Sequence, residues 1–199
     1  MPTTRIPTQQ RGIEKKEQII KKGFELMCNN GFYNTSTPEI AKYTGVSTGI
    51  IYQYFKDKKE IFIEGAKLYS NDIMFPIFAI IDEHEKLPND LRPMLKRIIE
   101  TNKKRHTYSK RAHQELTAME HLDDDIGNIF KEQELIFCDK LYNLFLNNNI
   151  PKEGLEEKTH LIVGIIDNLA HEEAYHKHKN LDYEKMEDIV INSIIAILK

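Results

Sequence analysis

The sequence predicts an all-α protein, and three observations support this fold class. Apolar residues recur at three- and four-residue spacing along almost the whole chain, which is the period of an amphipathic helix. No convincing pair of strands appears. The segments that interrupt the helical spacing are polar, at residues 87–90, 121–125 and 147–151. We therefore expect an N-terminal head of three helices followed by a C-terminal helical bundle.

The first helix is expected to end at Asn30-Gly31-Phe32, because a glycine after the last apolar turn is typical of a helix end. Its apolar stripe consists of Ile19, Ile20, Gly23, Phe24 and Met27. A second, short helix follows. It begins either with Thr37 as N-cap and Pro38 in the first turn, or with a capping box formed by Ser36 and Glu39.

The short helix is expected to end at Gly45, since glycine adopts the left-handed conformation that stops a helix and turns the chain. Ser47 then caps a third helix over residues 48–55, in which Ile51 and Phe55 face inward. The other residues of this helix remain available to contact a partner, and these are Thr48, Gly49, Ile50, Tyr52, Gln53 and Tyr54. Two short helices around such a turn are the signature of a helix-turn-helix that reads DNA.

A long helix is expected to start near Lys58, with Asp57 as its cap, and Pro76 should kink or end it. Its apolar face consists of Ile61, Phe62, Ala66, Tyr69 and Ile73. Further helices are expected at residues 90–104, 109–122, 126–148, 153–177 and 183–198.

Charge is distributed unevenly along the chain. Residues 1–60 carry ten Lys/Arg against six Asp/Glu, whereas residues 61–199 carry 18 against 25. A basic head suits contact with phosphates, because neutralised phosphates release counterions and supply most non-specific affinity for DNA. Most of these lysines are equally well explained as solvated helix faces, but Lys58 lies where a lysine could reach the DNA backbone.

Composition excludes several other classes. No apolar run is long enough to cross a bilayer, and the N-terminus lacks the apolar region of a signal peptide, so a cytoplasmic protein is expected. Cys28 and Cys138 have no CxxC companion, so neither a disulfide framework nor a metal site is expected. The chain contains no phosphate-binding glycine loop and no nucleophile elbow. We expect no enzyme activity and no cofactor.

The stretch from roughly Lys15 to Tyr69 resembles the DNA-binding domain of TetR-like (tetracycline-repressor family) transcriptional regulators. The resemblance implies that residues 48–55 enter the major groove of double-stranded DNA. The implied base contacts are Thr48, Gly49, Ile50 and Tyr52, and the implied phosphate contacts are Thr37, Ser47, Tyr54 and Lys58. Ile50 departs from the family, where threonine is more frequent, and it could contact a thymine methyl group or pack inward.

The resemblance also implies the organisation of the whole chain. Residues 1–60 would be the DNA-binding domain, with a disordered tail over about residues 1–11, and residues 61–199 would bind a ligand and dimerise. In the family, the last two helices form a homodimer, which would read a palindromic operator. The expected function is therefore a repressor that an unidentified small-molecule effector releases from its operator.

Residues that could surround such an effector are less certain from sequence, because aromatic and methionine stripes usually form ordinary core. The selected residues are Phe78, Tyr108, Met119, Phe137, Tyr142, Asn168, His171 and Tyr175. The last three form a polar row at positions i, i+3 and i+7, whose partner could be a ligand or a buried polar group such as Glu115.

Two rival functions stay open. A cluster of His171, Glu172, His176 and His178 could hold a metal in a helical module whose helix-turn-helix is structural, although histidines at a helix end are usually solvated. The chain could also be an activator that responds to no inducer. Binding to duplex DNA separates the first rival from a regulator.

Overall fold

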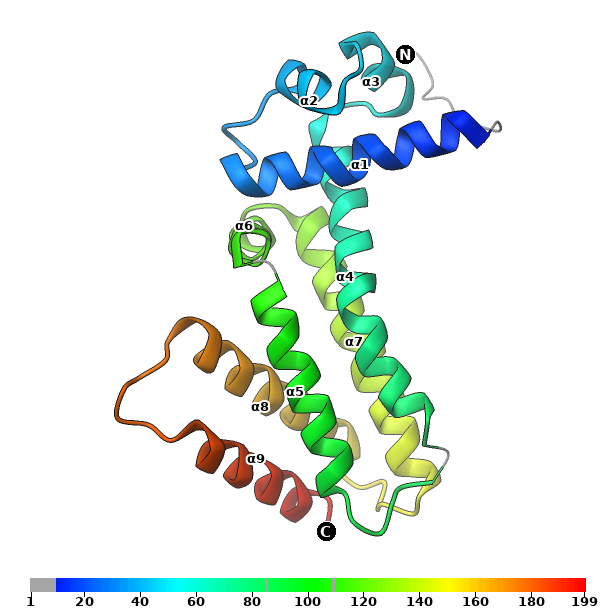
Figure 1. The fold of residues 1–199 in the computed structure, drawn as a ribbon. Coiled ribbons are helices and arrows are strands. Elements are labelled where there is room, and N and C mark those ends of the chain that lie inside the picture. Colours follow the sequence, from blue (N-terminus) through cyan, green and yellow to red (C-terminus); the bar gives the residue numbers. More distant parts are fainter. Residues whose placement is uncertain (1–9, 85, 109) are drawn as a thin grey trace. The chain divides into compact units, whose positions relative to one another are not determined.

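The computed structural model describes residues 10–84, 86–108 and 110–199 (Figure 1). Every regular element in these ranges is a helix, so the predicted all-α class is confirmed. The helices are α1 (Gln10–Asn30), α2 (Thr37–Thr44), α3 (Thr48–Tyr54), α4 (Lys58–Asp82), α5 (Arg92–Tyr108), α6 (Lys110–Leu122), α7 (Asp124–Asn147), α8 (Leu155–Tyr175) and α9 (Tyr183–Ile197). None of the described helices is both long and apolar enough to cross a membrane.

The observed helices follow the predicted ones with small shifts at their ends. Pro76 lies inside α4, so it does not end that helix. Most of the tail predicted at the N-terminus, residues 1–9, lies outside the described residues, but Gln10 and Arg11 belong to α1 rather than to a tail.

The described chain forms two compact units. The first runs up to Asn71 and also includes Arg111–Phe130, and the second consists of Asp72–Lys110 and Lys131–Lys199. The helix α6 and the start of α7 belong to the first unit because Ala112, Leu116 and Ile126 are buried in its core. The two compact units therefore differ from the two domains expected from sequence, which were divided at residue 60. That domain boundary stays a prediction.

The first unit is built on close approaches between α1, α2 and α4. A Cβ atom at Gly23 would lie 2.9 Å from a methyl group of Ile61 and 3.1 Å from one of Ile40. The rings of Phe24 and Phe62 contact each other with centroids 5.2 Å apart. These contacts fix the helices that carry the turn and α3.

Gly65→Ala is expected to destabilise the protein by about 1–3 kcal/mol, because an added group in a packed core forces side chains or backbone to shift. A Cβ at Gly65 would lie 2.4 Å from the Cβ of Phe24, which cannot rotate away. Chemical denaturation measures the change. Gly49→Ala is the control, since a Cβ there meets only the Ser47 hydroxyl at 3.8 Å; equal stability of the two variants would contradict the packing described.

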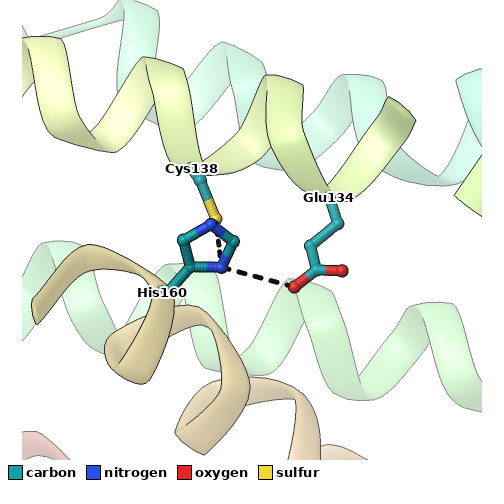
Figure 2. Close-up of side chains that lie close together, drawn as sticks. All are labelled: Glu134, Cys138 and His160. Carbon is teal, nitrogen blue, oxygen red and sulfur yellow. Dashed lines mark hydrogen bonds and ion pairs between the residues drawn. The ribbon is translucent and has the colours of Figure 1, made fainter. Parts of the chain in front are cut away.

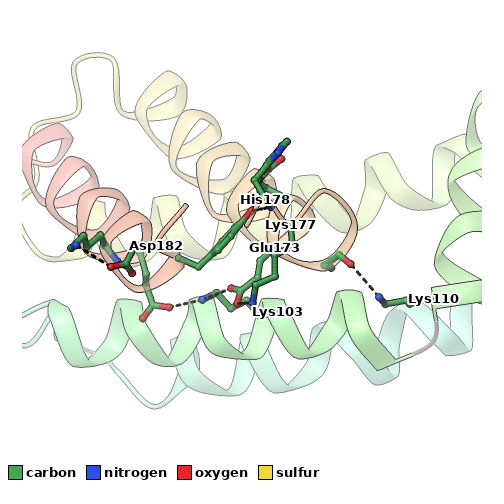
Figure 3. A network of polar contacts seen from close by, with 11 residues as sticks. Lys103, Lys110, Glu173, Lys177, His178 and Asp182 are labelled. Atoms are coloured by element: carbon green, nitrogen blue, oxygen red, sulfur yellow. Dashed lines mark hydrogen bonds and ion pairs between the residues drawn. The ribbon is translucent and has the colours of Figure 1, made fainter. Parts of the chain in front are cut away.

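The second unit buries a separate apolar core between α5, α7, α8 and α9. Its buried residues include Leu95, Ile98, Phe145, Ile162 and Ile194. Charged side chains tie three of these helices together (Figure 3). Lys103 on α5 lies 2.8 Å from a carboxylate oxygen of Glu173 on α8 and 2.7 Å from one of Glu187 on α9. Hydrogen bonding to Lys103 lowers the pKa of the Glu173 carboxyl.

Candidate nucleic-acid interface

The helix α2 starts with a capping box, one of the two alternatives that the sequence allowed. The Ser36 amide donates to Glu39 Oε2 at 2.8 Å, and the Glu39 amide donates to Ser36 Oγ at 3.4 Å. Ser36 is thus the N-cap, and Thr37, half-buried, is the first residue of the helix. The hydrogen bond from the Ser36 side chain, followed by that from its backbone, lowers the pKa of the Glu39 carboxyl.

The turn between α2 and α3 has the predicted geometry. Gly45 has φ 74° and caps α2 in the left-handed conformation, which a side chain would strain. Ser47 is the N-cap of α3 and accepts a hydrogen bond from the Ile50 amide at 3.3 Å. Two local caps therefore set the direction in which α3 leaves the turn.

The helix α3 has an inner and an outer face. Ile51 and Phe55 are almost completely buried in the core of the first unit, as the sequence predicted. Thr48, Gly49 and Tyr52 are exposed, and the Tyr52 side chain is 54% accessible to solvent. The outer face thus presents a hydroxyl, a site without a side chain and an aromatic ring.

Ile50 and Tyr54 lie between these two faces. Both are half-buried and pack against the core of the first unit, and the Tyr54 ring meets Phe55 edge-on with centroids 6.4 Å apart. Of the two alternatives for Ile50, the structure therefore favours inward packing. Its side chain still keeps part of its surface exposed on α3.

The ammonium group of Lys58 points into its own domain. Lys58 Nζ donates to the carbonyl oxygens of Phe32 at 2.6 Å and Thr35 at 2.7 Å. It also lies 4.6 Å from the centre of the Phe32 ring, which is cation–π distance. Lys58 therefore ties the start of α4 to the segment between α1 and α2.

Two long-range contacts connect α6 and its C-terminal end to the rest of the first unit. The Phe32 amide donates to Glu115 Oε1 at 2.5 Å. Lys59 Nζ lies 2.8 Å from an oxygen of Asp123 and 2.7 Å from one of Asp125. The hydrogen bond from Lys59 lowers the pKa of the Asp123 carboxyl, and the same pair of carboxylates raises the pKa of Lys59.

Sequence reasoning missed both contacts. The partners are separated by 83 and 66 residues, and no local pattern joins residues so far apart. Glu115 was considered only as a partner of the polar row on α8, whereas its carboxylate accepts from the Phe32 amide. In the structure, that row meets α5 instead: Tyr175 donates to the carbonyl oxygen of His106 at 2.7 Å, and the rings of His106 and His171 meet edge-on.

The other residues selected for effector binding are distributed over both units. Met119 is buried in the core of the first unit. In the second unit, Phe137 is buried and its ring lies 6.3 Å from that of Phe78, while Tyr142 packs against the same core. Asn168 is exposed on α8. The side chain of Tyr108 lies outside the described residues.

Comparison with known proteins identifies the domain that contains these features. Residues 19–64 match the family model described as bacterial regulatory proteins, tetR family. This part of the chain is therefore similar to the N-terminal domain of TetR-family regulators. The matched segment includes α2, the turn, α3 and the start of α4, which together form the interface described above.

Two relatives of known sequence resemble part of the chain, and both are named HTH-type transcriptional regulators. HTH-type transcriptional regulator HbdR of Aromatoleum sp. (strain CIB) is 46% identical over 48 residues, 24% of this chain and 21% of that protein. HTH-type transcriptional regulator AcrR of Shigella flexneri is 33% identical over 92 residues, 46% of this chain and 41% of that protein. The chain thus spans less than half the length of these curated relatives.

Solved structures extend the likeness to the complete fold. The crystal structure of a tetR-family transcriptional regulator from Streptomyces coelicolor superposes with a TM-score of 0.70, covering 93% of this chain and 80% of that one. The sequence identity is 14%, so this likeness concerns the fold alone. The similarity of fold therefore includes the helices of the second unit as well as the N-terminal domain.

Proposed function

We propose that this chain is a TetR-family, sequence-specific DNA-binding regulator of transcription, acting in the cytoplasm as a homodimeric repressor that a small-molecule effector releases from its operator. The observation that carries this proposal is the outer face of α3, where Thr48, Gly49 and Tyr52 are exposed next to two capped helix ends. Its function rests on binding and requires no catalytic group.

The outer face of α3 suits the major groove, which admits an α-helix and displays base edges. The Thr48 hydroxyl can donate to or accept from a base, and the Tyr52 ring can contact a thymine methyl group. Gly49 lets the helix backbone approach the bases closely. Thr37, Ser47 and Tyr54 lie beside this face on α2, the turn and α3, where they would contact phosphates and fix the register.

The contacts of Lys58 in the structure lead us to propose a supporting role for this residue in place of a direct phosphate contact. Its ammonium group already has two carbonyl partners within hydrogen-bond distance, so a direct phosphate contact would have to break or share these bonds. We infer that Lys58 supports the interface by holding the segment before α2, and that its charge attracts phosphate at longer range.

A second copy of the chain would pack on the outer faces of α8 and α9. These faces form an apolar groove lined by His160, Leu161, Gly164, Ile165, Asn168, Leu169, Met186 and Val190. Leu161, which lines the groove, and Ile189 of α9 are both more than half exposed. Exposure of large aliphatic side chains to water has a free-energy cost. A dimer would place two α3 helices on half-sites about 34–36 Å apart, or a multiple of one helical turn, so the operator is expected to be palindromic.

Effector binding would act on α3 through chain continuity. The helices α4 and α7 each begin in the first unit and continue into the second. In the first unit, Lys59 of α4 is held by Asp123 and Asp125 at the start of α7, and Glu115 of α6 holds Phe32. An effector that prefers the released form by about 1–3 kcal/mol or more would shift the population away from DNA.

Tyr52→Ala is expected to weaken operator binding by about 10-fold to 100-fold, since a side chain that contacts a base contributes about 1–3 kcal/mol of discrimination. The fold should be unaffected because Tyr52 is exposed. Fluorescence anisotropy with operator and scrambled duplexes measures both affinities. Tyr52→Phe keeps the ring and removes the hydroxyl group, so it distinguishes the contributions of these two groups to affinity.

The control is Tyr43→Ala, which removes another exposed tyrosine, one whose hydroxyl group contacts Glu25 on α1. This variant is expected to bind the operator like the unmodified protein. Loss of affinity in Tyr43→Ala but not in Tyr52→Ala would place the interface elsewhere than the outer face of α3.

A further inference from the structure

Three metal-ligating side chains converge between α7 and α8, outside the proposed interface (Figure 2). Glu134 and Cys138 lie one turn apart on α7, and His160 lies on α8. His160 Nδ1 is 3.6 Å from Cys138 Sγ and 3.6 Å from Glu134 Oε1. Among the residues described, these three form the group whose ligand atoms all lie within 4.8 Å of one another.

The spacing of the three atoms is close to that of a tetrahedral site. Bonds of about 2.3 Å to sulfur and about 2.0–2.2 Å to nitrogen and oxygen place tetrahedral ligand atoms about 3.4–3.6 Å apart. Both distances that involve His160 already have this value. The remaining approach, between Cys138 and Glu134, requires at most a rotation of the exposed glutamate side chain.

Hydrogen bonding alone satisfies this arrangement poorly. His160 Nδ1 carries either one proton or one lone pair, yet it faces a thiol and a carboxylate at the same distance. A proton on Nδ1 directed at Glu134 makes no hydrogen bond to the thiol sulfur, and a lone pair directed at the thiol also faces the carboxylate oxygen. A cation between the three atoms accepts a lone pair from each.

Burial divides the site into a protected and an accessible side. Cys138 is buried, whereas the side chains of Glu134 and His160 are 54% and 50% exposed, so an ion can enter from solvent. Burial, followed by the nearby Glu134 charge, raises the pKa of the Cys138 thiol to about 11. The thiol is therefore protonated at neutral pH, and a bound metal ion must displace its proton to the solvent.

We propose that Glu134, Cys138 and His160 bind one divalent transition-metal ion of the zinc class, with water in the fourth position. One sulfur, one imidazole and one carboxylate suit Zn²⁺ and its spectroscopic substitute Co²⁺, whereas Mg²⁺ and Ca²⁺ prefer oxygen ligands. The ion joins α7 to α8. The site does not involve α3, although His160 also lines the groove proposed for the second copy, and metal binding is measured without DNA.

The test is a titration of the full-length, tag-free protein with Co²⁺ alone, followed by competition with Zn²⁺. We expect one ion per chain, a sulfur-to-cobalt charge-transfer band and the visible bands of tetrahedral cobalt, all lost on adding Zn²⁺. His160→Gln should lower the affinity at least about tenfold, since even groups behind the ligands commonly matter that much. Because His160 is half exposed, this variant is expected to fold, which circular dichroism checks.

Matched controls exist for two of the ligands. Cys28→Ser removes the other buried free thiol, and Glu132→Gln removes an exposed carboxylate on the same helix as Glu134. Both variants should keep the charge-transfer band, whereas Cys138→Ala should abolish it and Glu134→Gln should weaken binding. Failure to bind Co²⁺, binding without a sulfur band, or a band of unchanged affinity in His160→Gln would overturn the proposal. All of these outcomes concern metal binding and leave the proposal for the outer face of α3 unaffected.

Discussion

Leu161→Lys is expected to convert the proposed homodimer into a monomer and to lower operator affinity by at least about a hundredfold. Leu161 lines the apolar groove on α8 and is 54% exposed in the single chain, so a lysine fits the monomer but places a charge in the proposed interface. A monomer binds one half-site and loses the high effective concentration of the second head, a loss of about 10²–10⁴ in affinity.

Leu135→Lys is the matched control, because Leu135 is a leucine on α7 with 57% exposure and is not among the residues that line the groove. Analytical ultracentrifugation gives the mass of each variant, and anisotropy gives its operator affinity. We expect Leu161→Lys to sediment as a monomer and Leu135→Lys as a dimer. A dimeric Leu161→Lys variant that binds the operator normally would move the interface to another face.

Lys58→Met is expected to destabilise the protein by about 2–3 kcal/mol. The ammonium group makes two short hydrogen bonds to the carbonyl oxygens of Phe32 and Thr35, and a hydrogen bond to a charged group has a net contribution of about 1.5–3 kcal/mol, which is discounted here because the half-buried lysine shares its charge with solvent. Methionine keeps the length and apolar surface of the side chain, so the variant isolates the loss of charge and donors. Urea denaturation measures the change.

Lys56→Met removes an exposed lysine two residues earlier and is expected to leave stability unchanged. The same pair of variants tests the phosphate contact implied for Lys58. A direct contact would reduce the slope of log affinity against log salt by about 0.9, whereas a supporting role would weaken binding with the slope preserved. Full stability combined with a reduced slope would contradict the internal role that the structure assigns to Lys58.

The parts of the fold that were predictable from sequence are those fixed by local chemistry. Ser36, Gly45 and Ser47 act on residues at most a few positions away, so their patterns determine where α2 and α3 begin and end. The inward direction of Ile51 and Phe55 follows from helical periodicity in the same way. Pro76 allowed either a kink or an end of the helix, and α4 continues past it.

The parts that could not be predicted depend on contacts between distant segments. Nothing near Lys58 in the sequence indicates that its ammonium group would meet the carbonyl oxygens of Phe32 and Thr35, because these contacts arise only when α4 packs beside the end of α1. The contact of Glu115 with Phe32 could not be predicted for the same reason. Nor could the cluster of Glu134, Cys138 and His160, because His160 lies on a different helix from Cys138.

The residues selected for effector binding stay a prediction, because the burial of some of these residues in a core does not test it. Met119 and Phe137 have the composition of a pocket wall, but both are buried in a core, one in each unit. Helical spacing indicates that a side chain faces inward, and it does not distinguish a packed neighbour from a ligand.

Salt-dependent binding of the purified protein to the DNA upstream of its own gene, compared with a scrambled duplex of the same composition, tests the central claim most directly. A sequence-specific regulator should prefer the native fragment by at least about a thousandfold at physiological salt, with affinity falling as salt rises. The preference should fall by about 10-fold to 100-fold in Tyr52→Ala. Absence of binding to either duplex at low salt would contradict a function in DNA recognition and leave the helix-turn-helix as a structural element.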